Sequence, residues 1–273
     1  MSMSVNTNVA ALTALQNLNS TSKSLAATQN RISTGLMVSS TKDDSASYTI
    51  AQKLRSDVGS LGSVSSSLSR AKSTVDVAVS GAQQISDLVN QMSAKATAAS
   101  DAGLDSTSRT AMATDFDALK AQITSVINAS SFNGTNLLKA SGGNVAALQS
   151  TDTTAATLDV ANQGMDTSVV TGIGTTFTDA ATAKTMVGTL ATVASAITTS
   201  LSTLGSASRM IDGQSTFVSK LSDVITSGIG NLVDADLSKE SANLQALQVK
   251  QQLGVQALSI ANQAPQSITS LFR

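Results

Sequence analysis

Apolar residues recur every seven positions through much of the first half of the chain, in two series offset by three. One series is Leu54, Leu61, Leu68, Val75, Ala82 and Val89, and the other is Ile50, Asp57, Val64, Ala71, Ala78, Ile85 and Met92. Such paired series form the a and d seam of a coiled coil, and only Asp57 departs from it. A helix of about 50 residues would be about 75 Å long, far longer than an ordinary globular helix. The spacing therefore predicts a long helix that buries one continuous stripe.

The same spacing returns in the second half of the chain. This second seam consists of Leu190, Ile197, Leu204, Ile211, Val218, Ile225 and Leu232. Between the two seams, apolar residues alternating by four and three predict a shorter helix over about 107–129, with Gly103 and Asp105 marking the preceding turn. Its stripe is Met112, Phe116, Leu119, Ile123 and Val126. We expect an α-dominated fold, a long antiparallel coiled-coil bundle whose core these stripes form.

Residues 131–179 lose this periodicity and are rich in Ser, Thr, Asn and Gly. Asn133-Gly134 and Gly142-Gly143 are turn signals, and residues 157–160 and 168–170 have the composition of short strands. We expect a small β-hairpin region at the tip of the bundle. Because this hydroxyl-rich sequence offers little apolar area to bury between subunits, residues 142–176 are expected to face outward and to be dispensable for assembly.

Each end of the chain carries the pattern of an amphipathic helix. The apolar positions of the two ends are Val5, Val9, Leu12, Leu15, Leu18, Leu25 and Ile32, then Leu237, Leu244, Leu247, Leu253, Leu258 and Ile260, with Leu271 and Phe272 near the C-terminus. Exposed apolar termini are a liability in a monomer and useful in an assembly. These residues are the candidate assembly interface.

Composition excludes several functions. The 273 residues contain no Cys or His, so a thiolate nucleophile, an imidazole base and the usual zinc and haem ligands are absent. We expect no enzyme, no cofactor and no metal site. The 17 basic and 18 acidic side chains leave no positive excess for nucleic acid. No run of 18 apolar residues is present to insert into a membrane, and Met1 to Asn6 lack the features of a cleaved signal peptide.

The densest charge cluster is Lys42-Asp43-Asp44, and it has two interpretations. Paired carboxylates can bind a cation or act as acid and base. The favoured interpretation is structural: the carboxylates cap a helix N-terminus and meet basic residues of a neighbouring copy.

The two ends also carry motifs that resemble bacterial flagellin. These motifs are residues 5–11 (VNTNVAA), 32–36 (ISTGL) with 42–44 (KDD), 131–134 (SFNG), 231–236 (NLVDAD), 260–266 (IANQAPQ) and 271–273 (LFR). The resemblance spans about 4–138 and 183–273. It implies a subunit that polymerises into the flagellar filament, a helical tube that transmits motor torque.

The resemblance also implies an arrangement and a set of partners. Residues 1–41 and 233–273 would pair as an inner domain lining a channel, residues 42–130 and 180–232 would form the surrounding tube, and residues 131–179 the tip. Besides copies of itself, the implied partners are a cap protein, a hook-filament junction protein, an export chaperone and the type III export apparatus. The chain would be extracellular and exported without a cleaved signal.

Some expectations differ from the common family pattern, and alternatives stay open. Only some 50 residues separate the two arms, so no large outer domain is expected. Residues 86–93 contain neither Arg nor Glu, so recognition by the innate-immune receptor that binds many flagellins is not expected.

The alternatives are the hook-filament junction protein of the same family and a chemoreceptor-like signalling coiled coil. The latter should carry more Glu than the single Glu240.

Overall fold

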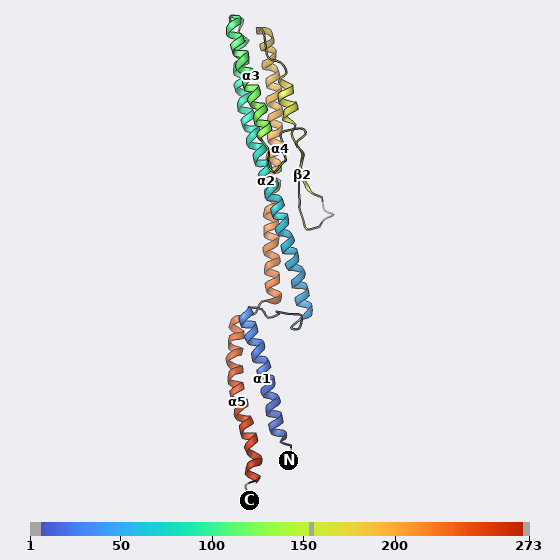
Figure 1. The fold of residues 1–273 in the computed structure, drawn as a ribbon, viewed down its shortest axis with the longest axis vertical. Helices are drawn as coiled ribbons and strands as arrows, with labels where there is room; N and C mark the ends of the chain where they lie inside the picture. The colour runs from blue at the N-terminus through green and yellow to red at the C-terminus, as the bar shows by residue number, and fades with distance from the viewer. Residues whose placement is uncertain (1–6, 153–155, 270–273) are drawn as a thin grey trace. The chain divides into compact units, whose positions relative to one another are not determined.

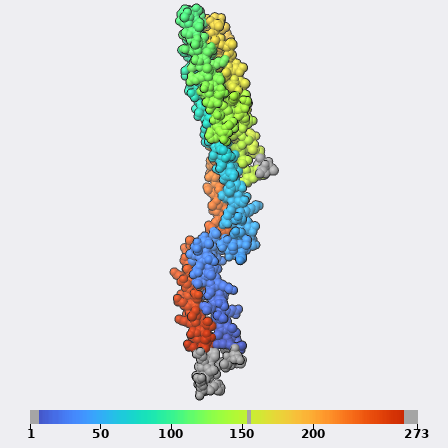
Figure 2. All heavy atoms as spheres, in the orientation of Figure 1, coloured from blue at the N-terminus to red at the C-terminus, as the bar shows by residue number. Residues whose placement is uncertain are grey.

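The computed structural model of the chain describes residues 7–152 and 156–269, with side chains up to residue 263. The chain divides into two compact units (Figure 1). The bundle unit is Asp57–Asp223, and the terminal unit combines Met1–Ser56 with Val224–Arg273. Helices α2 (Ser45–Ala99) and α4 (Ala180–Val233) each continue from one unit into the other. In the terminal unit, α1 (Val9–Thr34) and α5 (Leu237–Thr269) lie side by side (Figure 2).

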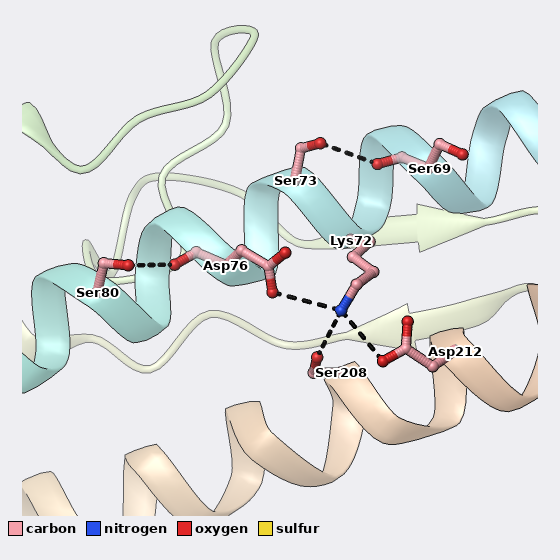
Figure 3. Close-up of polar contacts among 7 residues, drawn as sticks. All are labelled: Ser69, Lys72, Ser73, Asp76, Ser80, Ser208 and Asp212. Carbon is pink, nitrogen blue, oxygen red and sulfur yellow. Dashed lines mark hydrogen bonds and ion pairs between the residues drawn. The ribbon is translucent and has the colours of Figure 1, made fainter.

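The bundle unit packs α2, α3 (Ser106–Ala129) and α4 around one apolar core. Helices α2 and α4 run in opposite directions along the bundle (Figure 1). Their register is marked by Lys72, whose ammonium lies 3.1 Å from the Asp212 carboxylate and 3.2 Å from the Ser208 hydroxyl (Figure 3). The hydrogen bond to Asp212, helped by the charge of Asp76, raises the pKa of Lys72. The expected α-dominated antiparallel bundle is therefore the fold of this chain.

The structure buries most, but not all, of the residues expected in the bundle core. The buried ones are Leu61, Leu68, Val75, Ile85, Val89, Phe116, Ile123, Leu190, Ile197, Leu204, Ile211 and Val218. Leu119 is half-buried because it lines a groove between α2 and α3. Leu54, Ile225 and Leu232 are half-buried in the terminal unit, where Leu232 packs against a small cluster of Val38, Ala51 and Val233.

The segment between α3 and α4 contains a small hairpin and a π-helical turn. Strands β1 (Val145–Ala147) and β2 (Leu158–Val160) pair antiparallel, with Val145 opposite Val160. The hairpin lies alongside the bundle: Leu148 N–H donates to the Ser67 hydroxyl of α2, and Gln214 of α4 donates to the Gln149 carbonyl. The expectation of a two-stranded hairpin is confirmed. It was expected at the tip of the bundle, but it lies alongside α2 and α4. The π-helical turn η1 (Asp166–Thr171) covers residues expected to be a strand.

The same segment supplies large apolar side chains to the core of its own chain, which its composition did not indicate. Its buried apolar residues include Leu137, Leu138, Leu158, Val160, Met165, Val169, Ile173 and Phe177. The Phe177 ring meets Phe116 of α3 edge to face at 5.3 Å. Burying the side chains of hydrophobic residues is the main stabilising contribution to a fold, so this segment belongs to the bundle.

A buried arginine that the sequence analysis missed holds the turn between α2 and α3. Asp105 caps α3 as expected, accepting from Ser108 N–H at 2.9 Å. Arg109 donates to the carbonyls of Ala99, Asp101 and Leu104 at 3.0, 2.9 and 3.1 Å. These oxygens include the last carbonyl of α2, where a helix has no internal donors and favours a cation.

Replacing Arg109 with Met should therefore destabilise the bundle. Methionine keeps much of the length but leaves three carbonyls without their charged donor, a loss of about 2 kcal/mol in unfolding free energy. Urea unfolding of the monomer followed by circular dichroism measures it. Arg209→Met, at an exposed arginine of α4, is the control and should change stability by less than about 0.5 kcal/mol. Equal effects of the two substitutions would contradict the capping role.

Among the described residues, one helix is long and apolar enough to cross a membrane by composition. It is α4, in which an 18-residue window has a mean hydropathy of 1.3. A search for uninterrupted apolar runs misses it because Ser and Thr separate its apolar residues. In the structure, the α4 residues from Leu190 to Val218 that fall seven apart are buried in the bundle core, as expected for a core helix.

Candidate assembly surface

Helices α1 and α5 pair antiparallel along their length. At one end, Asn8 donates to the Ala261 carbonyl at 2.7 Å while its side-chain oxygen caps α1. At the other end, Arg31 lies 3.4 Å from Glu240. Between these contacts, the backbone of Gly254 approaches Leu18 so closely that an added Cβ would lie 3.2 Å from the Leu18 Cδ1.

This helix pair has a seam, but none of its described large apolar side chains is fully buried. The less exposed residues of the seam are spaced by three, four or seven: Ala11, Ala14, Leu18, Leu25, Thr28 and Ile32 in α1, and Glu240, Leu244, Leu247, Gly254, Leu258 and Ala261 in α5. Thr28 is the buried residue of α1, and Glu240 is the buried one among the described side chains of α5. Both are polar, so the apolar contribution to pairing is modest.

Other apolar side chains of α1 and α5 remain largely exposed. Their exposed fractions are 71% for Val9, 60% for Leu12, 43% for Leu15, 50% for Leu237, 55% for Val249, 57% for Leu253, 55% for Val255 and 69% for Ile260. Exposed apolar side chains gathered on two neighbouring helices are typical of a surface that another chain covers. We call these eight residues the outer apolar face.

The sequence-predicted interface residues therefore divide into two groups. Leu18, Leu25, Ile32, Leu244, Leu247 and Leu258 are half-buried in the seam, whereas Val9, Leu12, Leu15, Leu237, Leu253 and Ile260 belong to the outer apolar face. Val5, Leu271 and Phe272 lie outside the described residues. The sequence analysis missed Val249 and Val255.

The loop after α1 ties this helix to the residues between α4 and α5. Gly35 ends α1 in the left-handed conformation, with φ at 71°. The N–H groups of Met37 and Val38 donate to the Val233 carbonyl at 2.7 and 3.2 Å, and Ala235 N–H donates back to Gly35 at 2.9 Å. Val38 and Val233 also pack together with Ala51 in a small apolar cluster. These contacts hold the loop after α1 against the end of α4, within the terminal unit.

The two carboxylates of the charge cluster organise this loop. Asp44 accepts from Ala46 N–H at 2.9 Å and from the Ser47 hydroxyl at 2.7 Å, which caps the start of α2. Asp43 accepts from the N–H and the hydroxyl of both Ser39 and Ser40, at 3.0 to 3.1 Å. The Ser39 hydroxyl is the main cause of the lowered pKa of Asp43, and the Ser47 hydroxyl of the lowered pKa of Asp44. These contacts favour the structural interpretation of the cluster.

The loop should consequently loosen in acid, at a pH set by Asp43. Because its pKa is below the usual 3.8 when folded, its stabilising effect is complete above 3.8 and is lost as the pH falls through the lower folded value. An NMR titration of the Ser39 and Ser40 amides should show a midpoint below 3.8. Asp43→Asn should abolish this titration, and Asp44→Asn should retain it. A midpoint at or above 3.8 would contradict the hydrogen-bond arrangement.

From the sequence, Glu240 was noted only for its rarity, yet it is buried at one end of the α1–α5 contact, in the first turn of α5. Its Oε1 faces Arg31, and its buried Oε2 has no hydrogen-bond partner among the described residues. An ion pair of this kind sets the register of two helices more than it stabilises them. Its signal in the sequence was its rarity: it is the single Glu of the chain.

These features define a class of protein. No group of three or more His, Cys, Asp or Glu side chains able to hold a metal ion occurs within the described part of the chain. What the structure does provide is a well-packed helical bundle and a loosely packed helix pair with an uncovered apolar face. They define an α-helical protein whose terminal helices leave apolar side chains exposed.

Comparison with known proteins identifies the family. Residues 5–143 match the bacterial flagellin N-terminal helical region, and residues 178–272 match the bacterial flagellin C-terminal helical region. Flagellin FljM of Caulobacter vibrioides is 46% identical over 274 residues, covering 99% of this chain and 98% of that one. The flagellin of Brucella melitensis is 39% identical, covering 99% of both chains. The crystal structure of Bacillus cereus flagellin shares the fold, with a TM-score of 0.51, 23% identity and coverage of 55% of this chain and 86% of that one.

The chain therefore belongs to the bacterial flagellin family and is a structural subunit of the flagellar filament. The alignment to FljM spans 274 positions for a chain of 273 residues, so both proteins have a short middle segment. Like FljM, this chain is a flagellin without a large outer domain.

Proposed function

We propose that the outer apolar face of α1 and α5 is the surface by which each subunit binds its neighbours in the filament. The observation that carries this proposal is the exposure of Val9, Leu12 and Leu15 on a helix whose own seam buries only Thr28. Fully burying a Val or Leu side chain contributes about 1.5–3 kcal/mol. Covering eight such residues per subunit would favour the ordered state of both helices in the filament.

In the assembled filament, the bundle unit would supply the stiff wall of the tube and the terminal unit its inner layer. The work of the protein is then mechanical: a continuous helical tube transmits motor torque, and no catalytic group takes part. The further partners that this role requires are the cap protein, the hook-filament junction protein, an export chaperone and the type III export apparatus. The filament is extracellular, and export proceeds without a cleaved signal.

Polar substitution of the outer apolar face tests the proposal. The triple variant Val9→Ser, Leu12→Ser and Leu15→Ser removes three exposed apolar side chains from α1. We expect elongation of filament seeds to slow by at least about a hundredfold, because each lost side chain contributes about 1 kcal/mol or more to the contact. Light scattering and electron microscopy measure elongation.

The matched control replaces three exposed polar residues of the same helix, Gln16, Asn19 and Lys23, with Ser. This variant removes no large apolar side chain and should elongate seeds at nearly the native rate. If both triple variants elongated like the native chain, the outer apolar face would not be the assembly surface.

A further inference from the structure

The turn after α3 carries an Asn-Gly pair that combines a structural role with a chemical reactivity. Phe132 and Thr135 face each other in an antiparallel bridge, where each N–H donates to the carbonyl of the other at 2.9 and 3.0 Å. Asn133 and Gly134 form the turn between them, with φ of 49° and 82°. A type I′ turn requires positive φ at both central residues, and Asn-Gly is a favoured pair for it.

An asparagine that precedes a glycine can react with its own backbone. The backbone nitrogen of the glycine attacks the Cγ of the asparagine, a C–N bond forms, and the Cγ–Nδ2 bond breaks. The amide leaves as ammonia and takes the proton of the glycine N–H with it. Water then opens the five-membered succinimide at either carbonyl, which yields aspartate or isoaspartate. Water is the only other reactant, and nothing is oxidised or reduced.

Both reacting groups are accessible in the folded chain. Asn133 and Gly134 are exposed, and a Cβ added to Gly134 would meet no atom within 4 Å. Within the part of the chain that the structure describes, neither the Asn133 side chain nor the Gly134 N–H makes a hydrogen bond. The attacking nitrogen therefore has no hydrogen bond to lose, and no packed side chain shields the amide it attacks.

The attack requires the peptide between Asn133 and Gly134 to rotate, and the bridge between Phe132 and Thr135 opposes this rotation. The bridge consists of two hydrogen bonds, and it lies at the surface, with Phe132 exposed and Thr135 half-buried. Exposed turns of this kind open at a small fraction of the free energy of global unfolding. The turn thus slows the reaction without preventing it.

The chain beyond the turn is held firmly, so the opening stays local. Asn136 is buried, and its Nδ2 donates to the Ile127 carbonyl at 2.6 Å. Its Oδ1 accepts from Leu138 N–H at 2.9 Å, and the Leu138 side chain is fully buried. A chemical change in the turn therefore leaves the bundle core in place.

Asn90 of α2 serves as an internal reference for a slow site. It is also exposed, but it lies inside a long helix, where the amide of the following Gln91 is hydrogen-bonded along the helix. The Gln91 side chain also crowds the nitrogen that would have to attack. Opening the interior of a helix costs more free energy than opening an exposed turn.

We propose that Asn133 is a site of spontaneous deamidation, at which the folded subunit gains an aspartate or an isoaspartate. Either product adds a negative charge to a chain whose formal net charge is -1. Isoaspartate also lengthens the backbone of the turn by a carbon, so Phe132 and Thr135 lose their pairing. This inference concerns the turn alone and stands whether or not the outer apolar face is the assembly surface.

Mass spectrometry of the folded monomer tests the site. The chain is incubated at mildly alkaline pH, because the attacking nitrogen reacts in its deprotonated form, and an unincubated sample is digested in parallel. Trypsin places Asn90 in the peptide 73–95 and Asn133 in the peptide 121–139. We expect deamidation at Asn133 to be at least about tenfold faster than at Asn90, which corresponds to a barrier lower by about 1.4 kcal/mol.

A matched variant links the change in charge to this residue. Asn133→Gly creates a Gly-Gly turn, which also fits type I′ geometry, and removes the reactive amide. On isoelectric focusing, the incubated native chain should develop an acidic form that migrates with Asn133→Asp, and Asn133→Gly should not. The proposal is overturned if Asn133 is deamidated no faster than Asn90, or if Asn133→Gly gains the acidic form as fast as the native chain.

Discussion

Replacing Ile211 with Asp should unfold the bundle at far lower urea concentrations than the native chain needs. Ile211 has no exposed surface and lies in the α4 stripe between Leu204 and Val218, both also buried. A carboxylate there would have to be buried without a partner or be protonated, and its apolar contacts would be lost. We expect a decrease of about 4 kcal/mol in unfolding free energy.

The neighbouring residue provides a matched control. Met210 precedes Ile211 in α4 but is 55% exposed, so Met210→Asp places the same charge in solvent. This control should lower the free energy of unfolding by less than about 1 kcal/mol. Circular dichroism of the dilute monomer during urea unfolding measures both. If Ile211→Asp were no worse than Met210→Asp, the assignment of the buried stripe would be wrong.

Excising residues 142–176 should have the second largest effect. The excision removes Met165, Val169 and Ile173, which are at most 2% exposed, together with the buried residues of the hairpin. At about 1.5–3 kcal/mol for each buried side chain, the bundle would lose on the order of 5 kcal/mol or more. We therefore expect a partly unfolded monomer that does not elongate filament seeds, measured by thermal unfolding and electron microscopy.

A pair of point variants separates the loss of a buried side chain from other effects of the excision. Val169 is fully buried and Ser168 beside it is exposed. Val169→Ser should cost about 2 kcal/mol, and Ser168→Ala should cost less than about 1 kcal/mol. If the excised chain unfolded at the native temperature and Val169→Ser were neutral, the segment would be dispensable after all.

The long helices could be predicted from sequence because their burial is periodic. Each turn of α2 and α4 meets the same neighbours, so the side chains at Leu61, Leu68 and Val75, or at Leu190, Ile197 and Leu204, experience the same environment. Asp105 was predictable for a local reason, since a helix start needs a side-chain acceptor whatever surrounds it.

The buried residues of the middle segment were missed because an average composition hides the position of each residue. Its many hydroxyls suggest an exposed loop, yet Met165, Val169, Ile173 and Phe177 recur every four residues and are all buried. This spacing is a helical signal, and the structure has a π-helical turn within it. Considering the spacing of the apolar residues, and not only their fraction, would have predicted this helical turn.

Contacts between segments distant in sequence could not be predicted residue by residue. Arg109 reaches carbonyls of a turn whose shape depends on how α2 and α3 pack. Likewise, nothing in the stripe of α1 distinguishes Leu18, which faces α5, from Leu15, which remains 43% exposed. The choice depends on the register of α5, set by Asn8 with Ala261 and Arg31 with Glu240.

We expect α1 and α5 to be weakly held in one chain and to become ordered when neighbouring copies cover their outer apolar face. Amide hydrogen exchange followed by mass spectrometry, on dilute monomer and on filament side by side, tests it most directly. We expect residues 61–92 of α2 to be protected in both states, and residues 12–32 and 240–260 to exchange rapidly in the monomer and slowly in the filament. Protection of residues 12–32 and 240–260 in the dilute monomer equal to that of residues 61–92 would contradict the claim.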